Sequence, residues 1–249
     1  PQAGVLDAVK ALAARRCHAA VLFASGYAEA GEEGQARQQA LADAARAAGV
    51  LLVGPNCMGF TNLAAGVPVT FEPLAARPHE QRPGVGVVAQ SGFMAANLRD
   101  AFLGRGVAVT SVFSTGNEVD LDSADFIHWL AHDPGTDLIC TVMEGIRDGA
   151  RFVAAARAAR RAGKPLIALK IGRSDFGKKA AQSHTASLAG EDVVNDAVFS
   201  QHGVIRVEDL DELLDVASLI SRVGVRSLQR VCVYSSSGGA GVLSADKVG

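Results

Sequence analysis

Short apolar runs alternate with amphipathic stretches of helical length along most of the chain. The apolar runs predict strands at residues 20–24, 50–53, 85–89, 107–113, 138–143, 165–171 and 230–234. The amphipathic stretches predict helices at residues 34–48, 92–103, 122–131, 148–162, 191–200 and 208–221, with one more after residue 241. The strand runs are apolar throughout rather than alternating, which is typical of parallel sheets covered by helices on both faces. We therefore expect a doubly wound α/β architecture in more than one unit.

A less regular, proline-rich stretch interrupts this alternation. Pro68, Pro73, Pro78 and Pro83 fall within it, and no other stretch is as rich in proline. Such composition favours a domain boundary. The chain opens in the helix-like sequence VLDAVKALAARR without an initiator methionine, and it stops as a strand–helix unit begins. We interpret both ends as cut edges of a larger polypeptide.

Composition narrows the classes of partner. The 249 residues carry a formal net charge of -2, so no basic surplus points to nucleic acid or an anionic membrane surface. No apolar run has transmembrane length. The four cysteines are widely spaced and form no C-x-x-C pair, which argues against a disulfide framework or a zinc site. Reduced thiols in a cytoplasmic protein are the simplest interpretation.

Two serine- and glycine-rich turns each join a predicted strand to a predicted helix, in VGVVAQSGFMAANL and VCVYSSSGGAGVLSAD. In a doubly wound sheet such turns lie at the carboxyl edge, where ligands bind. The first amides of a helix have no partners within it and carry the positive end of its dipole, so they suit a phosphate. The candidate phosphate-binding residues are Ser91, Gly92, Ser237, Gly238 and Gly239. A serine that only caps its helix would explain one turn, and the pair favours phosphate chemistry.

The segment GRSDFGKKAAQSHTASLAGED holds one histidine, His184, between two hydroxyl residues and among small ones. Neutral imidazole is abundant near pH 7 and is a good nucleophile. A carboxylate on the other ring nitrogen would fix the tautomer and stabilise positive charge. Glu144, at the end of the strand LICTVME, is the best candidate because it lies at the same sheet edge. A loop histidine with ordinary solvent contacts remains an equal alternative from these residues alone.

Other candidate residues favour structural roles. His128 and His132 are one helical turn apart, but Trp129 stands where a zinc protease has glutamate and no third ligand is evident, so no metal site is expected. Cys57 follows Gly-Pro-Asn and is interpreted as a small apolar filler.

A cationic group precedes the histidine. Lys178 and Lys179, together with Arg173, would either attract phosphates to the histidine segment or simply be solvated at the surface.

The motifs SHTASLAG, GPNCMGF, QSGF, STGNEVD, MEGIRD and SSSGGAG together resemble, in order, the ADP-forming acetyl-CoA synthetases and related NDP-forming acyl-CoA synthetases. These are relatives of the succinyl-CoA synthetase alpha subunit. The resemblance runs from about Cys17 to the end of the chain. It implies Rossmann-like and flavodoxin-like doubly wound parallel sheets in consecutive subdomains. Residues 1–78 would be part of a CoA-binding domain, 79–226 a flavodoxin-like ligase domain, and 227–249 the start of a second ligase-like subdomain.

The same resemblance implies roles for the candidate residues. His184 would be transiently phosphorylated and Glu144 would orient it, while the two glycine-rich helix starts would bind phosphate. Asn56, Asn117 and Glu118 would lie near the CoA and acyl groups. Ala186 stands where the family often has glycine, a small change from which we expect little effect on the chemistry.

The implied reaction joins a carboxylic acid and CoA using ATP, reversibly, through an acyl phosphate and a phosphohistidine. ATP or ADP, with magnesium, would bind an ATP-grasp domain or subunit outside this chain. That domain would also decide between ADP and GDP. Because the first strand of the CoA-binding domain is missing, this chain alone would bind CoA poorly. The family commonly forms homo- or hetero-oligomers.

Two further classes of function stay open. One is a CoA- or acyl-CoA-sensing module of a protein lysine acetyltransferase, although such relatives often lack the reactive histidine that is retained here. The other is a structural subunit, for which replacing His184 would change nothing.

Overall fold

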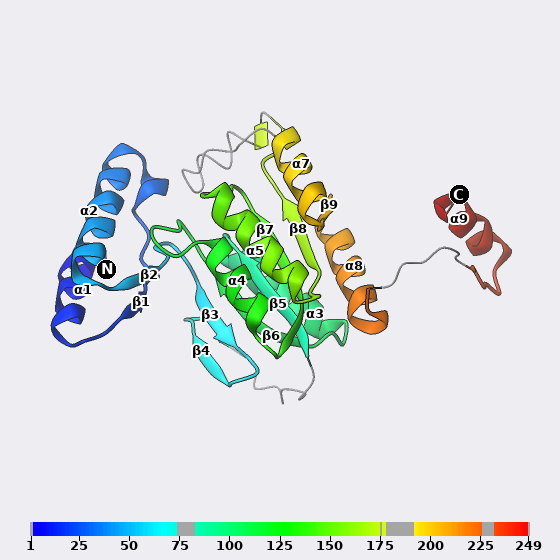
Figure 1. Cartoon of the computed structure of the whole chain (residues 1–249), viewed down its shortest axis with the longest axis horizontal. Coiled ribbons are helices and arrows are strands. Elements are labelled where there is room, and N and C mark those ends of the chain that lie inside the picture. Colours follow the sequence, from blue (N-terminus) through cyan, green and yellow to red (C-terminus); the bar gives the residue numbers. More distant parts are fainter. Residues whose placement is uncertain (1, 74–82, 175, 178–191, 226–231, 249) are drawn as a thin grey trace.

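In the part of the chain that the structure describes, the strands form two sheets of different size (Figure 1). The computed structural model describes residues 2–73, 83–174, 176–177, 192–225 and 232–248. In the smaller sheet β1 (Ala19–Val21) pairs in parallel with β2 (Leu51–Val53). The elements around it are η1 (Gln2–Gly4), α1 (Val5–Ala14), η2 (Ala28–Ala30) and α2 (Glu32–Ala48). Gly49 adopts a φ of 66°, the left-handed conformation that ends α2 as predicted.

The larger sheet has, within the described residues, seven strands in the order β4-β3-β6-β5-β7-β8-β9. Their bounds are β3 (Gly59–Asn62), β4 (Val67–Val69), β5 (Gly84–Ala89), β6 (Val109–Ser114), β7 (Thr136–Met143), β8 (Leu166–Lys170) and β9 (Val204–Val207). The last five of these strands are parallel, and numbered by their own order in the chain they lie as 2-1-3-4-5. That is the flavodoxin-like order, so the predicted doubly wound fold is confirmed.

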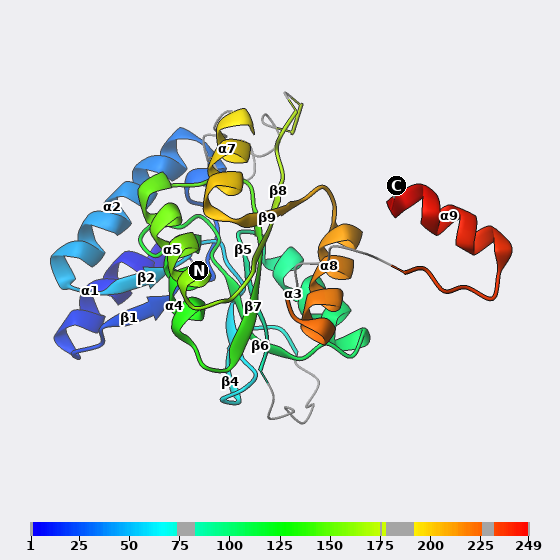
Figure 2. The same ribbon diagram turned by 45° about the vertical axis from the view of Figure 1, so that its right-hand side comes forward.

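Helices cover both faces of this sheet (Figure 2). They are α3 (Gly92–Gly104), α4 (Ser123–His132), α5 (Gly149–Arg161), α7 (Asp192–His202) and α8 (Leu210–Val223). Alternate residues of β5 face opposite layers: Val87 packs in one core cluster with Phe102 of α3 and Leu213 of α8, whereas Val88 packs in the other with residues of α4 and α5. Every residue of β5 is buried, which explains its uninterrupted apolar sequence.

Helix starts follow local polar signals. Asp122 caps α4 in a reciprocal capping box with Asp125, and Asp148 and Asp209 cap α5 and α8. These caps place the helices within one or two residues of the predicted bounds. Among the described residues, no helix is long and apolar enough to cross a membrane.

The sequence pattern missed the hairpin formed by β3 and β4. Strand β3 of this hairpin pairs antiparallel with β6. The larger sheet therefore includes residues from Gly59 onward, which lie before the expected domain boundary at residue 78. The strands of the hairpin have only three or four residues, and one contains Pro68, which is tolerated because β4 is an edge strand. The short strand β9 was also missed.

The strand predicted at residues 230–234 is wrong in its described part. Residues 232–234 form no strand, and Tyr234 is 97% exposed. A strand needs a neighbour for its backbone groups, and an apolar run alone does not supply one. The helix that follows, α9 (Gly238–Val248), begins earlier than predicted and stands apart from α3 and the larger sheet in both views (Figures 1 and 2).

Candidate functional site

The site lies at the carboxyl edge of the larger sheet, between β5 and β7. The strand order reverses there, and this switch point is where doubly wound sheets bind ligands. Gln90 directly follows β5, and Glu144 directly follows β7. Both residues are buried. The sequence therefore delivers two polar side chains to adjoining strand ends.

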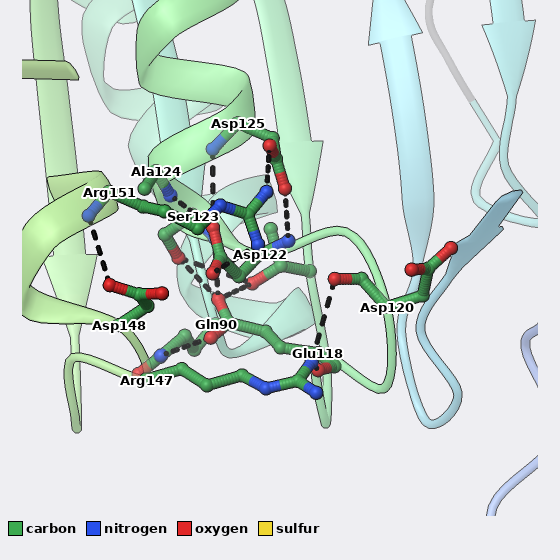
Figure 3. Close-up of polar contacts among 11 residues, drawn as sticks. Gln90, Glu118, Asp120, Asp122, Ser123, Ala124, Asp125, Arg147, Asp148 and Arg151 are labelled. Atoms are coloured by element: carbon green, nitrogen blue, oxygen red, sulfur yellow. Dashed lines mark hydrogen bonds and ion pairs between the residues drawn. The ribbon is translucent and has the colours of Figure 1, made fainter. Parts of the chain in front are cut away.

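Gln90 joins these strand ends through its side-chain amide, which Figure 3 shows beside Glu118. Its Oε1 accepts from the backbone N–H of Glu144 at 2.5 Å and of Gly145 at 3.1 Å. Its Nε2 donates to the Gly145 carbonyl at 2.9 Å and to Glu118 Oε2 at 3.0 Å. All four hydrogen-bonding positions of the amide are thus used inside the protein.

Glu118 is a buried carboxylate in the turn after β6. Its Oε1 accepts from the Thr115 hydroxyl at 2.8 Å, the Ser123 hydroxyl at 2.5 Å and the Ser123 backbone N–H at 2.9 Å. Burial raises the pKa of Glu118, while the donors from Ser123, Thr115 and Gln90 act in the opposite direction. Its φ of 55° is uncommon for a residue with a side chain. The carboxylate faces interior donors rather than open space.

Asn117 connects the turn to the smaller sheet. Its Nδ2 donates to Glu29 at 2.5 Å and to Gln38 at 3.0 Å, and its Oδ1 accepts from Asn56 at 3.3 Å. The predicted pair Asn56 and Asn117 is therefore brought together. Glu29 also accepts from the backbone amides of residues 26 and 27. Burial acts to raise the pKa of Glu29, but the hydrogen bonds from Asn117 and from these backbone amides together lower it.

A polar cavity of about 460 Å³ opens between α2 and this turn. Gln35, Gln39 and Arg46 line it from α2. Arg147 lines it from the loop after β7, where its guanidinium donates to the carbonyl of Glu118 (Figure 3). The cavity thus reaches Gln90 and the turn at residues 116–119, and its amides and arginines suit a polar or anionic ligand.

Helix α3 begins directly after the turn that follows β5, as predicted, and packing gives Gly92 a structural role of its own. Ser91 is the residue before the helix, and within the described part of the chain its hydroxyl makes no capping hydrogen bond. A Cβ on Gly92 would meet Met58 Cγ at 2.2 Å. Packing against Met58 therefore requires glycine here whether or not an anion approaches.

The second predicted helix start is not brought to the first. Ser237, Gly238 and Gly239 begin α9 and are exposed, and α9 lies well away from α3 (Figures 1 and 2). The structure therefore does not place the two glycine-rich turns at one point.

His184 lies outside the described residues, as do Lys178 and Lys179, but the ends of their segment are placed. This segment begins after β8, the neighbour of β7 in the sheet, and ends at the start of α7. Arg173 before it pairs with Asp192 after it at 3.3 Å, and also with Glu208. These ion pairs connect Arg173, before the segment, to the first turn of α7 and to Glu208 after β9.

Lys170 fixes the strand ends beside Glu144. It is 2% exposed, and its Nζ donates to the carbonyls of Glu144 at 2.6 Å and Ile171 at 2.5 Å. The end of β7 and the departure of the histidine segment are therefore held together by one buried cation. Sequence reasoning missed Lys170, Gln90 and Glu29. For the first two the available signal was a polar residue at the end of an apolar strand.

Cys57 is buried, with its thiol 3.4 Å from the Leu22 carbonyl. Burial raises its pKa to about 11, so the thiol stays neutral at physiological pH and is a poor nucleophile. His132 Nδ1 lies 2.8 Å from the carbonyl oxygen of His128 on the same helix and donates to it in the Nδ1–H tautomer. Among the described residues no group of three or more metal-binding side chains forms.

We expect alkylation to separate these thiols. At pH 8, iodoacetamide should modify exposed Cys17 and Cys232 and spare Cys57 and Cys140, because thiolate forms only above the raised pKa values. Peptide mass mapping of native protein would measure this, with urea-unfolded protein as the control in which all four react. Rapid native modification of Cys57 would contradict the burial.

Comparison with known families assigns the class. Residues 1–62 match the CoA binding domain model, and residues 82–220 match the succinyl-CoA ligase like flavodoxin domain. A trans-feruloyl-CoA synthase from an unknown prokaryotic organism is 37% identical over 99% of this chain and 35% of its own length. The ADP-forming acetate–CoA ligase I of Archaeoglobus fulgidus is 37% identical over 97% of the chain and 34% of its own length.

Solved structures agree. The acetyl-coenzyme A synthetase 1 of Ca. Korarchaeum cryptofilum, in complex with phosphate and ADP, superposes with a TM-score of 0.88 at 29% identity over 99% of this chain and 52% of that one. The chain belongs to the succinyl-CoA ligase-like family, in the group of NDP-forming acyl-CoA synthetases. It spans between a third and a half of the length of the curated relatives it matches, including 48% of the alpha subunit of the ADP-forming acetate–CoA ligase II of Pyrococcus furiosus.

Proposed function

We propose that this chain supplies the CoA-binding and phosphohistidine-bearing part of an enzyme that interconverts a carboxylic acid, CoA and ATP with acyl-CoA, ADP and phosphate. The observation that supports the proposal is that Glu144, directly after β7, lies beside the end of β8, after which the His184 segment begins, and that Lys170 at this end of β8 donates to the Glu144 backbone carbonyl. A nucleophilic histidine in the segment after β8 would have a carboxylate partner and a helix start at the same edge of the sheet.

In the thioester-consuming direction, a phosphate oxygen attacks the acyl carbon and the carbon–sulfur bond breaks. CoA leaves as thiolate and takes a proton, and an acyl phosphate remains. A ring nitrogen of His184 then attacks phosphorus, the phosphorus–oxygen bond breaks, and the carboxylate leaves. The phosphoryl group passes finally from His184 to a nucleoside diphosphate, which regenerates neutral imidazole.

Each residue has a part in this scheme. Glu144 accepts from the other ring nitrogen of His184 and stabilises the charge that develops there. The amides at Ser91 and Gly92 hold phosphate oxygens. The polar cavity beside Asn117 takes the reacting end of CoA and the acid, with Asn56 and Glu118 shaping its edge. Ser237, Gly238 and Gly239 would join as the second phosphate-binding end after α9 docks in the whole protein.

The wider assembly is part of the proposal. Nucleotide and magnesium bind an ATP-grasp domain or subunit, a proposal supported by relatives in which this region matches 48% of a chain named as an alpha subunit. The whole enzyme is a homo- or hetero-oligomer in the cytoplasm. Within this chain we divide the CoA-binding part, residues 1–78, from the ligase parts, 79–226 and 227–249, with the hairpin of β3 and β4 bonded across to the ligase sheet.

The test uses the full-length protein with ATP labelled in its γ-phosphate and magnesium. We expect acid-labile, base-stable label on the protein, and a chase with ADP should return this label to ATP whichever acid is the substrate. Adding acetate and CoA tests one acid, with release of labelled phosphate as the readout. A folded protein that binds ATP yet takes up no label would refute the proposal and favour the CoA-sensing module.

A further inference from the structure

Gln90 is held in one orientation by the backbone around it. Its Oε1 faces two N–H donors, those of Glu144 and Gly145, and its Nε2 faces the Gly145 carbonyl. Turning the amide over would set its NH2 group against both N–H groups. The second hydrogen of Nε2 consequently needs an acceptor, which is Glu118 Oε2 at 3.0 Å.

Toward Gln90 Nε2 and the Ser123 backbone N–H, Glu118 can act only as an acceptor. Its other oxygen already receives the backbone N–H of Ser123, along with the hydroxyls of Ser123 and Thr115. The residue is 5% exposed, so its carboxylate is set among donors and away from solvent. A buried polar network of this kind holds one arrangement when every member is satisfied.

The turn that carries Glu118 is tied to the same strand end. Gly116 N donates to the Gln90 carbonyl at 3.0 Å, and Arg147 donates to the Glu118 carbonyl. A Cβ on Gly116 would lie 2.2 Å from the Pro55 carbonyl oxygen, so the turn also fits closely against the segment before Asn56. The position of the Glu118 side chain is therefore set from several directions.

We infer that Glu118 is a positioning residue that acts through Gln90 to fix the backbone at Glu144 and the adjoining start of α3. The inference rests on the proposed function, since it concerns the placement of Glu144 for phosphoryl transfer. It replaces the expectation that the Glu118 carboxylate contacts CoA or the acyl group. A shift of about 1 Å in a reacting group can cost on the order of 100-fold in rate.

Exchanging the two side chains tests the partnership. In Glu118→Gln alone, the new NH2 group faces either Gln90 Nε2 or the Ser123 donors, and in Gln90→Glu alone two carboxylates meet in the interior. In the double variant, the amide introduced at position 118 donates to the carboxylate introduced at position 90, which restores the pair. That carboxylate still accepts from the backbone N–H groups of Glu144 and Gly145. The Gly145 carbonyl loses its donor and faces a carboxylate oxygen instead, so the recovery is incomplete.

The measurement is the rate of label transfer from γ-labelled ATP to the full-length protein at saturating ATP, with KM for CoA measured separately. Each single variant should label at least about tenfold more slowly, and the double variant should label faster than either single variant, with KM for CoA unchanged throughout. Glu33→Gln, whose side chain is 91% exposed on α2, is the matched control and should label at the wild-type rate.

Three results would overturn the inference: wild-type labelling by Glu118→Gln, a raised KM for CoA with an unchanged labelling rate, or a folded double variant no faster than either single one. If Glu118→Gln does not fold, Ser123→Ala removes one donor from the carboxylate and should slow labelling more weakly. Normal labelling by that variant would likewise count against the inference. Wild-type protein that takes up no label would instead refute the proposed function.

Discussion

Replacing His184 with alanine should abolish acid-labile labelling of the full-length protein by γ-labelled ATP. The reason is that alanine has no nitrogen to attack phosphorus. Acyl-CoA formation should fall below detection together with the label. Quenched labelling followed by peptide mapping measures both the amount and the position of the phosphoryl group.

The control is another histidine. His18 is exposed on the loop before β1, and His18→Ala should label as the wild type does. Thermal unfolding of the two variants should match, because neither change removes a described core side chain. Label that persists in His184→Ala at a different residue would show that the nucleophile was assigned wrongly. If both variants take up the same amount of label at residues other than histidine, the result would favour the alternative in which this chain is a structural subunit.

Replacing Phe199 with alanine should cost about 3–5 kcal/mol of stability in the flavodoxin-like part. Phe199 is 1% exposed on α7 and its ring lies 5.5 Å from that of Phe152 on α5. This contact anchors α7, which begins where the His184 segment ends. Truncation therefore leaves a cavity between the two helices and loosens the return of the segment.

Hydrogen exchange of the full-length protein measures the effect without requiring that all domains unfold together. Peptides from α5 and α7 should exchange at least about 100-fold faster in Phe199→Ala than in the wild type, as follows from the lost free energy. Phe176→Ala is the matched control, because its ring is 88% exposed and its loss should change stability by no more than about 0.5 kcal/mol. Unchanged protection of α7 in Phe199→Ala would contradict the packing.

The main elements of the fold could be predicted because their signals are local. A strand buried on both faces must be apolar at nearly every position, and β5 and β8 follow that rule until the lysine that ends β8. Helix bounds followed from Asp122 and Gly49, whose effects reach only a few residues. The hairpin of β3 and β4 and the strand β9 were not predicted because short edge strands depend on a neighbour far along the chain.

The sequence by itself determined the fold class and the family, and it singled out candidate segments for the chemistry, because ordered motifs and strand runs are properties of neighbouring residues. Only the tertiary structure decided how the candidate side chains are used. Glu118 accepts from Thr115 in the same turn, whereas its neighbour Asn117 donates to Glu29, which is distant in the sequence. Gln90, at the end of β5, donates to the carbonyl of Gly145 after the adjoining strand β7. No spacing along a chain encodes such contacts, since they arise when parallel strands bring their carboxyl ends to one edge. The tertiary structure also places Met58 against Gly92, so close packing is a reason for glycine there in addition to any approaching anion.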